Sequence, residues 1–145
     1  MKHTFLFKKG VWLATGKYYN ENNEEFDIIG ITKTIHKEGI WINECFTELS
    51  LNNPIKFFNN YEIIPFDVNK DYTTWIAKNA PEGLINGKIV IIKDVIISDY
   101  YSKDGSYSGI EISTQIDEKT YESKGFIFQD NIKISSWSVI MTLSE

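Results

Sequence analysis

Hydrophobic and polar residues alternate most regularly between residues 83 and 117. A long apolar run in this segment is followed by Asp104-Gly105 and then by isoleucines that alternate with polar residues. An Asp-Gly pair between two such runs predicts a β-hairpin, because glycine tolerates the positive φ of a tight turn. A turn centred on this pair places Ile97 opposite Ile112, whereas a slip of one residue would place polar side chains opposite isoleucines. The pattern therefore predicts both the hairpin and its register.

The same register assigns the side chains of the hairpin to two faces. One face carries Glu111, and on it Tyr100 lies opposite Gly109, where an aromatic ring can cover the bare glycine backbone. The other face collects the apolar residues, and we expect it to be buried. Its members are Ile89, Ile91, Val95, Ile97, Tyr101, Ile110, Ile112 and Ile116.

Runs rich in β-branched and aromatic residues, separated by polar turns, predict strands along the rest of the chain. The expected strands cover residues 10–19, 26–36, 40–49, 61–66, 120–128 and 132–143. Residues 71–80 fit two structures. Asp71 could cap a helix that ends at Pro81, and Thr73-Thr74-Trp75-Ile76 would serve equally well as a strand.

About eight strands at nearly regular spacing favour an antiparallel meander. Closure into a barrel is the simplest way for such a meander to remove its exposed edges. We therefore expect residues 1–145 to form a single all-β, up-and-down barrel. Its interior should continue through Tyr121, Ile127, Trp137, Val139 and Met141.

Composition narrows the classes of function. The chain is 42% hydrophobic and has 145 residues, which is enough to bury a core. Its net charge is −5, and all 15 basic residues are lysines. Because arginine supplies the bidentate contacts to phosphate and guanine, we expect no nucleic-acid partner.

Cysteine and histidine usage argues against metal and disulfide chemistry. Cys45 is the single cysteine, and His3 and His36 are too far apart in sequence to form a His-x-His or His-x-x-x-His pair. We expect no disulfide, no metal site and no cofactor. The apolar runs are too short for a signal-peptide core or a membrane-spanning helix, so a cytoplasmic protein without a membrane partner is expected.

Gly10-Val11-Trp12 opens the first expected strand. A Gly-x-Trp at this place resembles the calycin superfamily, which includes the lipocalins. The resemblance implies an up-and-down barrel whose Trp closes one end and whose interior binds a small, usually apolar, ligand. The family's Trp usually packs under an Arg near the last strand, and this chain has no arginine. Lys133 stands where a substitute is expected, but it lacks the flat guanidinium face.

The resemblance and the supply of aromatic residues predict a barrel that binds a small apolar molecule and has no catalytic chemistry of its own. Access is expected from the end near His36, with the loop of residues 52–60 as a lid through Pro54, Phe57 and Phe58. The candidate ligand-binding residues are Trp12, Tyr18, His36, Trp41, Tyr101, Tyr121 and Trp137.

Two other functions fit the same sequence. A barrel enzyme, such as an isomerase or cyclase, would use His36, Tyr101 and Glu111 for acid–base chemistry. A barrel whose core is filled by side chains would instead have a structural or interaction role.

One apolar patch is expected outside the barrel. Carrying the register across Gln129-Asp130-Asn131 brings Phe126, Phe128, Ile132 and Ile134 together on the face opposite to the core. An exposed patch of this size usually marks an interface. It predicts a homodimer, with the alternative that Phe5-Leu6-Phe7 folds back to cover it.

Overall fold

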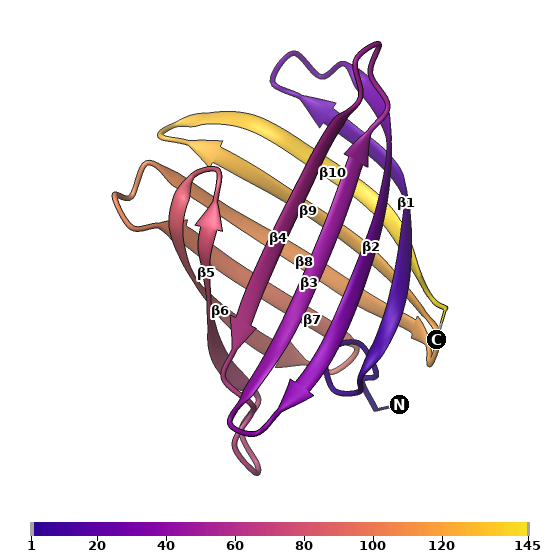
Figure 1. Cartoon of the computed structure of the whole chain (residues 1–145), viewed down its shortest axis with the longest axis vertical. Helices are drawn as coiled ribbons and strands as arrows, with labels where there is room; N and C mark the ends of the chain where they lie inside the picture. The colour runs from indigo at the N-terminus through magenta and orange to yellow at the C-terminus, as the bar shows by residue number, and fades with distance from the viewer. Residues whose placement is uncertain (1, 145) are drawn as a thin grey trace.

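The computed structural model describes residues 2–144, which form a closed antiparallel β-barrel (Figure 1). Each strand pairs with its neighbours in sequence, and β1 closes the barrel by pairing with β10. None of the described residues is helical, so the expected all-β barrel is confirmed. The strands are β1 (Gly10–Asn20), β2 (Glu25–Lys37), β3 (Ile40–Leu49), β4 (Ile55–Ile63), β5 (Tyr72–Ala80), β6 (Gly83–Ile92), β7 (Val95–Ser102), β8 (Tyr107–Asp117), β9 (Thr120–Gln129) and β10 (Ile132–Leu143).

The barrel has ten strands rather than about eight. The ambiguous segment forms a strand, β5, which pairs with β4 and β6. A two-residue turn at Lys93-Asp94 divides the first arm of the predicted hairpin into β6 and β7. Lys93 has a φ of 51°. Because turn signals assign positive φ to Gly, Asn or Asp, this turn leaves little trace in the sequence.

The β7–β8 hairpin has the register that the sequence predicts, with Ile97 opposite Ile112 and Tyr100 opposite Gly109. Its faces, however, are the reverse of those expected. Ile112 is 42% exposed on the outer wall. Glu111, one position earlier, points into the barrel.

A β-bulge explains this reversal. At the β8–β9 turn the register shifts, so that Gln115 rather than Ile116 pairs with Tyr121. One extra residue in a strand moves the side chains beyond it to the opposite face. Tyr121 is therefore inside, as expected, while the isoleucines of β8 are outside.

The Lys93-Asp94 turn produces a second difference, because it pairs Ile91 with Ile96. The face expected to be a single core is consequently divided between the two sides of the wall. Ile89 and Ile91 face inward, and the outward-facing members are Val95, Ile97, Tyr101, Ile110, Ile112 and Ile116.

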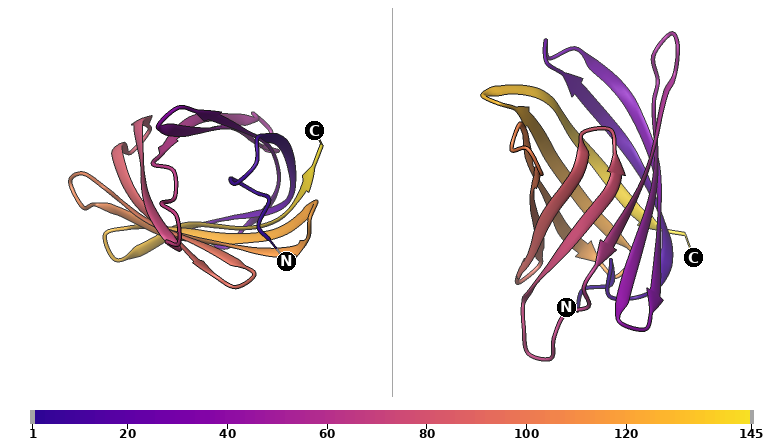
Figure 2. Two further views of the ribbon diagram at one scale, coloured as in Figure 1. Left: turned by 90° about the horizontal axis from the view of Figure 1, so that it is seen from below. Right: turned by 60° about the vertical axis from the view of Figure 1, so that its left-hand side comes forward.

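The N-terminal segment closes one end of the barrel (Figure 2). Phe5 and Leu6 are buried in the main hydrophobic cluster together with Trp12 and Tyr121. The backbone N of Thr4 donates to the Tyr121 hydroxyl at 3.1 Å, and its side chain donates to the Glu118 carbonyl at 2.7 Å. We call this closed end the floor and the opposite end the mouth.

Trp12 is part of the floor, but Lys133 does not cover it. Trp12 lies opposite Leu143 at one end of β10, whereas Lys133 lies near the other end of that strand. The ring of Trp12 makes edge contacts with Phe5, at a centroid distance of 5.7 Å, and with Tyr121, at 5.4 Å. Two aromatic rings therefore pack on this Trp.

Candidate functional site

Above the floor, several inward-facing side chains of the barrel keep part of their surface accessible. Inward-facing side chains inside a closed wall keep accessible surface only where neighbouring side chains leave space between them. Trp12 and Tyr121 at the floor are fully buried. By contrast, the following inward-facing residues remain partly accessible: Tyr18, Thr32, Cys45, Thr47, Asn59, Tyr61, Tyr100, Glu111, Ile127 and Trp137.

Glu111 is the central acidic group of this space. Its strand is separated by β9 from the strand of Trp137, and Gly125 lies opposite both residues. The indole lies over Gly125, where a Cβ would be only 2.4 Å from Cζ2 of Trp137. The missing side chain lets Nε1 of Trp137 donate a 2.9 Å hydrogen bond to Oε2 of Glu111.

The same device, an aromatic ring over a glycine of the next strand, occurs twice more. Trp75 lies over Gly87, where a Cβ would be 2.1 Å from the indole, and its Nε1 donates to the Ser98 hydroxyl at 2.9 Å. Tyr100 lies over Gly109, where a Cβ would be 2.6 Å from the ring. The predicted covering of Gly109 by Tyr100 is therefore confirmed.

Three further polar side chains belong to the same environment as Glu111. Burial raises the pKa of the Glu111 carboxyl, and the hydrogen bond from Trp137 opposes this rise. Burial likewise raises the pKa of Cys45, to about 12, and the pKa values of Tyr61 and Tyr100. The charge of Glu111 adds to each of these three increases. We name Cys45, Tyr61, Tyr100, Glu111 and Trp137 the interior belt.

Glu111 is thus the acidic group of the interior belt with the lowest ordinary pKa, and burial raises that pKa. A thiol with a pKa of about 12 stays protonated, so Cys45 is a weak nucleophile. Thr32 and Asn43 approach its sulfur at 3.5 and 3.6 Å. Glu111 makes one hydrogen bond among the described residues, although a carboxylate can accept about four. Its remaining acceptor capacity is available to a ligand.

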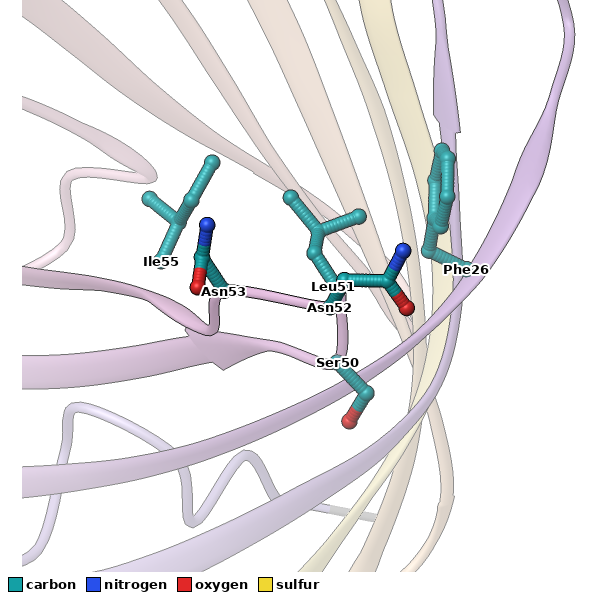
Figure 3. Close-up of a pocket in the computed structure, with 6 residues that line it drawn as sticks. All are labelled: Phe26, Ser50, Leu51, Asn52, Asn53 and Ile55. Atoms are coloured by element: carbon teal, nitrogen blue, oxygen red, sulfur yellow. The ribbon is translucent and has the colours of Figure 1, made fainter.

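The mouth holds a cavity of about 700 Å³ (Figure 3). Phe26 and Ile55 face inward at the ends of their strands, next to the β3–β4 loop. The cavity is lined by Phe26, Ser50, Leu51, Asn52, Asn53 and Ile55. It lies within the size range of small-molecule sites.

The expected lid and entrance need correction. Since β4 begins at Ile55, Phe57 and Phe58 belong to a strand rather than to a loop. Phe57 faces inward and Phe58, which is 61% exposed, faces outward. His36 lies at the opposite end of the barrel from this loop, because it donates from Nε2 to the carbonyl of Leu6 in the floor at 2.7 Å. The two expected parts of the entrance are therefore separate.

The predicted ligand residues fall into three groups. Trp12, Tyr121, His36 and Trp41 belong to or adjoin the floor, where the rings of His36 and Trp41 stack at 4.3 Å. Tyr18 and Trp137 lie opposite each other in the open part of the interior. Tyr101, expected inside, is on the outer wall and is 48% exposed.

The proposed enzyme triad is likewise dispersed. His36 is at the floor, Tyr101 is outside and Glu111 is in the interior belt. Among residues 2–144, no group of three His, Cys, Asp or Glu side chains is placed to hold a metal ion. The described part of the chain also contains no helix long and apolar enough to span a membrane.

Sequence reasoning missed most of the interior belt. The alternation of apolar residues puts Glu111 on the face opposite to the expected core, whereas the structure puts it inside. The signal that could have found the belt is the pairing of tryptophans with strand glycines. Gly87 and Gly125 each lie opposite a Trp, as Gly109 lies opposite Tyr100.

No protein-family model matches the sequence, and no curated protein matches it. Two solved structures, a putative AttH from Nitrosomonas europaea and an N-terminal dehydratase from the difficidin assembly line, have TM-scores of 0.35 and 0.29, which are too low to bear on the fold. The S-type phycobiliprotein lyase CPES from Guillardia theta has a TM-score of 0.68 at 10% sequence identity. The similarity covers 97% of this chain and 90% of the lyase. At this identity it shows the fold alone, which is an all-β, calycin-like barrel.

Proposed function

We propose that the protein binds a small, largely apolar, ring-containing molecule in the open part of its barrel. The ligand would reach the interior belt through the mouth and present an N–H or cationic group to Glu111. The observation that carries this proposal is Glu111 itself, an enclosed carboxyl that remains partly accessible and has one hydrogen-bond donor, Trp137. Burying a carboxylate is costly unless a partner compensates it, and a ligand N–H can act as that partner.

The lining of the interior favours flat, ring-containing ligands. Tyr100 and Trp137 lie flat over glycines of the neighbouring strands and remain partly accessible, so that aromatic rings line the space. Aromatic faces bind flat apolar groups and cations with little loss of side-chain entropy. A fatty acid suits this site less, because its carboxylate would meet the charge of Glu111.

The filled-core alternative accounts for the lower half of the barrel, where the floor is densely packed. It does not account for the partly accessible side chains above the floor. The similarity to the lyase supports a calycin-like barrel, but a shared fold does not determine function. The proposal therefore depends on the interior belt.

A ligand panel with matched variants tests this function. The lyase of similar fold is named as a phycobiliprotein lyase. A bilin, which carries pyrrole N–H groups, is therefore the first probe. A cationic triphenylmethane dye, the neutral dye Nile red and palmitate complete the panel. Because Trp137 lines the interior, binding of the bilin and of the cationic dye should quench tryptophan fluorescence saturably at micromolar concentrations. It should also raise the melting temperature.

The variant Glu111→Gln should weaken binding of the bilin and the cationic dye about tenfold or more, because it removes the charge that faces their N–H or cationic groups. Nile red should be affected much less. Glu38→Gln, in the exposed β2–β3 turn, is the matched control and should bind every probe as the unmodified protein does. If all probes give only linear quenching and no melting shift, the binding function is wrong.

A further inference from the structure

The outer wall of β1 to β4 carries a row of apolar side chains that runs across the strands. Leu13 lies opposite Ile31, Ile31 opposite Phe46, and Phe46 opposite Phe58. We call these four residues the front stripe. Leu13, Ile31 and Phe58 are between 43% and 61% exposed, which is high for large apolar side chains in one contiguous row.

Two neighbouring isoleucines widen the front stripe. Ile29 and Ile140 both flank Thr15 on the same wall, and each is 45% exposed. The combined exposed apolar surface is on the order of a few hundred Å², the size that marks a contact surface on a soluble protein.

The charges beside the front stripe show which partner fits it. In the next row, Lys33 lies opposite Glu44 on the neighbouring strand. Neither makes an ion pair with another described residue. Elsewhere on the same wall Lys56 pairs with Glu48 within the chain. Lys33 and Glu44 are thus neighbouring side chains of opposite charge, and neither forms an ion pair within the described part of the chain.

We propose that the front stripe is the contact surface for a second copy of this chain. A twofold axis that runs parallel to the strands, between β2 and β3, exchanges the two central strands. It places Ile31 against Phe46 of the partner subunit. It also places Lys33 against Glu44 of the partner subunit, twice by symmetry. A wall with balanced charges in register is self-complementary, and packed sheets about 10 Å apart let these side chains meet.

This surface differs from the patch that the sequence predicts for a dimer. Phe126 and Phe128 lie on the opposite wall, and their rings already contact each other at 5.6 Å. Phe126 is 36% exposed and Ile132 of the same patch is 63% exposed, so this second surface is also open to solvent. The two surfaces predict the same stoichiometry through different walls, so variants can separate them.

A charge-reversal complementation experiment tests the interface. Size-exclusion chromatography with light scattering at tens of micromolar protein should show a dimer for the unmodified chain. Lys33→Glu alone, or Glu44→Lys alone, puts like charges at both symmetric contacts and should weaken dimerisation at least tenfold. An equimolar mixture of the two variants should restore a dimer, because each contact again joins opposite charges.

The mixture is decisive because a second chain can restore opposite charges only at contacts between subunits. It cannot correct a like-charge contact within one chain. Phe58→Asp should also abolish the dimer, whereas Ile112→Asp and Phe128→Asp, on the opposite wall, should preserve it. Circular dichroism confirms that each variant is folded. A monomeric unmodified chain, single variants that dimerise normally, a mixture that stays monomeric, or a dimer lost only in the opposite-wall variants would each overturn the proposal.

Discussion

Trp137 reaches across a whole strand to donate its indole N–H to Glu111, over 2.9 Å. The contact is allowed because the residue between them, Gly125, has no side chain. It connects two strands that do not pair with each other and fixes a carboxyl inside the barrel. The properties of the interior should therefore depend on these three positions.

The first prediction concerns the pH dependence of stability. Burial raises the pKa of Glu111 in the folded state above its unfolded value of about 4.3. The folded protein therefore binds more protons than the unfolded chain as pH rises from that value, and the free energy of unfolding falls with pH. Glu111→Gln removes this loss. Its stability relative to the unmodified protein should be lowest near pH 4 and should increase toward pH 7 in urea denaturation.

Glu38→Gln, at an exposed turn position, is the control for this comparison and should show a nearly constant difference from pH 4 to pH 7. A constant difference for Glu111→Gln as well would show that the carboxyl is solvated like a surface group.

The second prediction concerns Gly125. A Cβ there would lie 2.4 Å from the Trp137 ring and 2.9 Å from the Ile110 carbonyl, so Gly125→Ala should displace the indole. We expect a loss of roughly 1–3 kcal/mol in the free energy of unfolding and a shifted tryptophan emission spectrum. Gly30→Ala is the milder comparison, since its nearest neighbour, the Phe46 carbonyl oxygen, would be 3.3 Å away and would need to move only slightly. Equal effects of the two substitutions would contradict the role assigned to Gly125.

The third prediction concerns the floor. Tyr121→Phe removes the hydroxyl that accepts hydrogen bonds from the backbone N of Thr4 and of Phe5. Leaving buried donors without an acceptor should cost about 1–3 kcal/mol and speed hydrogen exchange at these two amides. Tyr19→Phe, which loses an exposed contact to Glu25, should change stability much less. Unchanged exchange at Thr4 would show that the segment is held by other contacts.

The fourth prediction separates the two faces of the central strands. Ile89 is 3% exposed and faces inward, so Ile89→Ala should cost roughly 2–5 kcal/mol. Ile112 faces outward, so Ile112→Ala should cost about 1 kcal/mol or less. Guanidinium denaturation measures both. A larger loss for Ile112→Ala would mean that its wall is covered in solution.

The sequence predicted the register of β7 and β8 correctly but not which face is inside. Pairing follows from the alternation of isoleucines and from Asp104-Gly105, which are local signals. The inside is decided by the bulge beside Ile116 and by the turn at Lys93-Asp94, and neither uses glycine or proline. Alternation alone cannot identify the interior of a barrel that is lined in part by polar side chains such as Ser113 and Ser123.

The candidate site was predictable only in part, for the same reason. Tyr18 and Trp137 follow from aromatic content and strand assignment, and they lie opposite each other inside. Tyr101 was placed on the wrong side, and Glu111 was treated as outward-facing, because their faces depend on the same turn and bulge. Contacts such as that of Trp75 over Gly87 depend on strand pairing, which composition does not contain.

The pairing of β1 with β10 also has a consequence for the order of folding. Trp12 and Leu143 are opposite each other in space but lie at far ends of the chain, so closure carries a large loop-entropy cost. During synthesis, hairpins from β1 to β9 can form early, but each still exposes an unpaired edge until β10 emerges. The enclosed interior is thus a property of the finished barrel, and ribosome-bound chains that lack β10 should be open sheets prone to association.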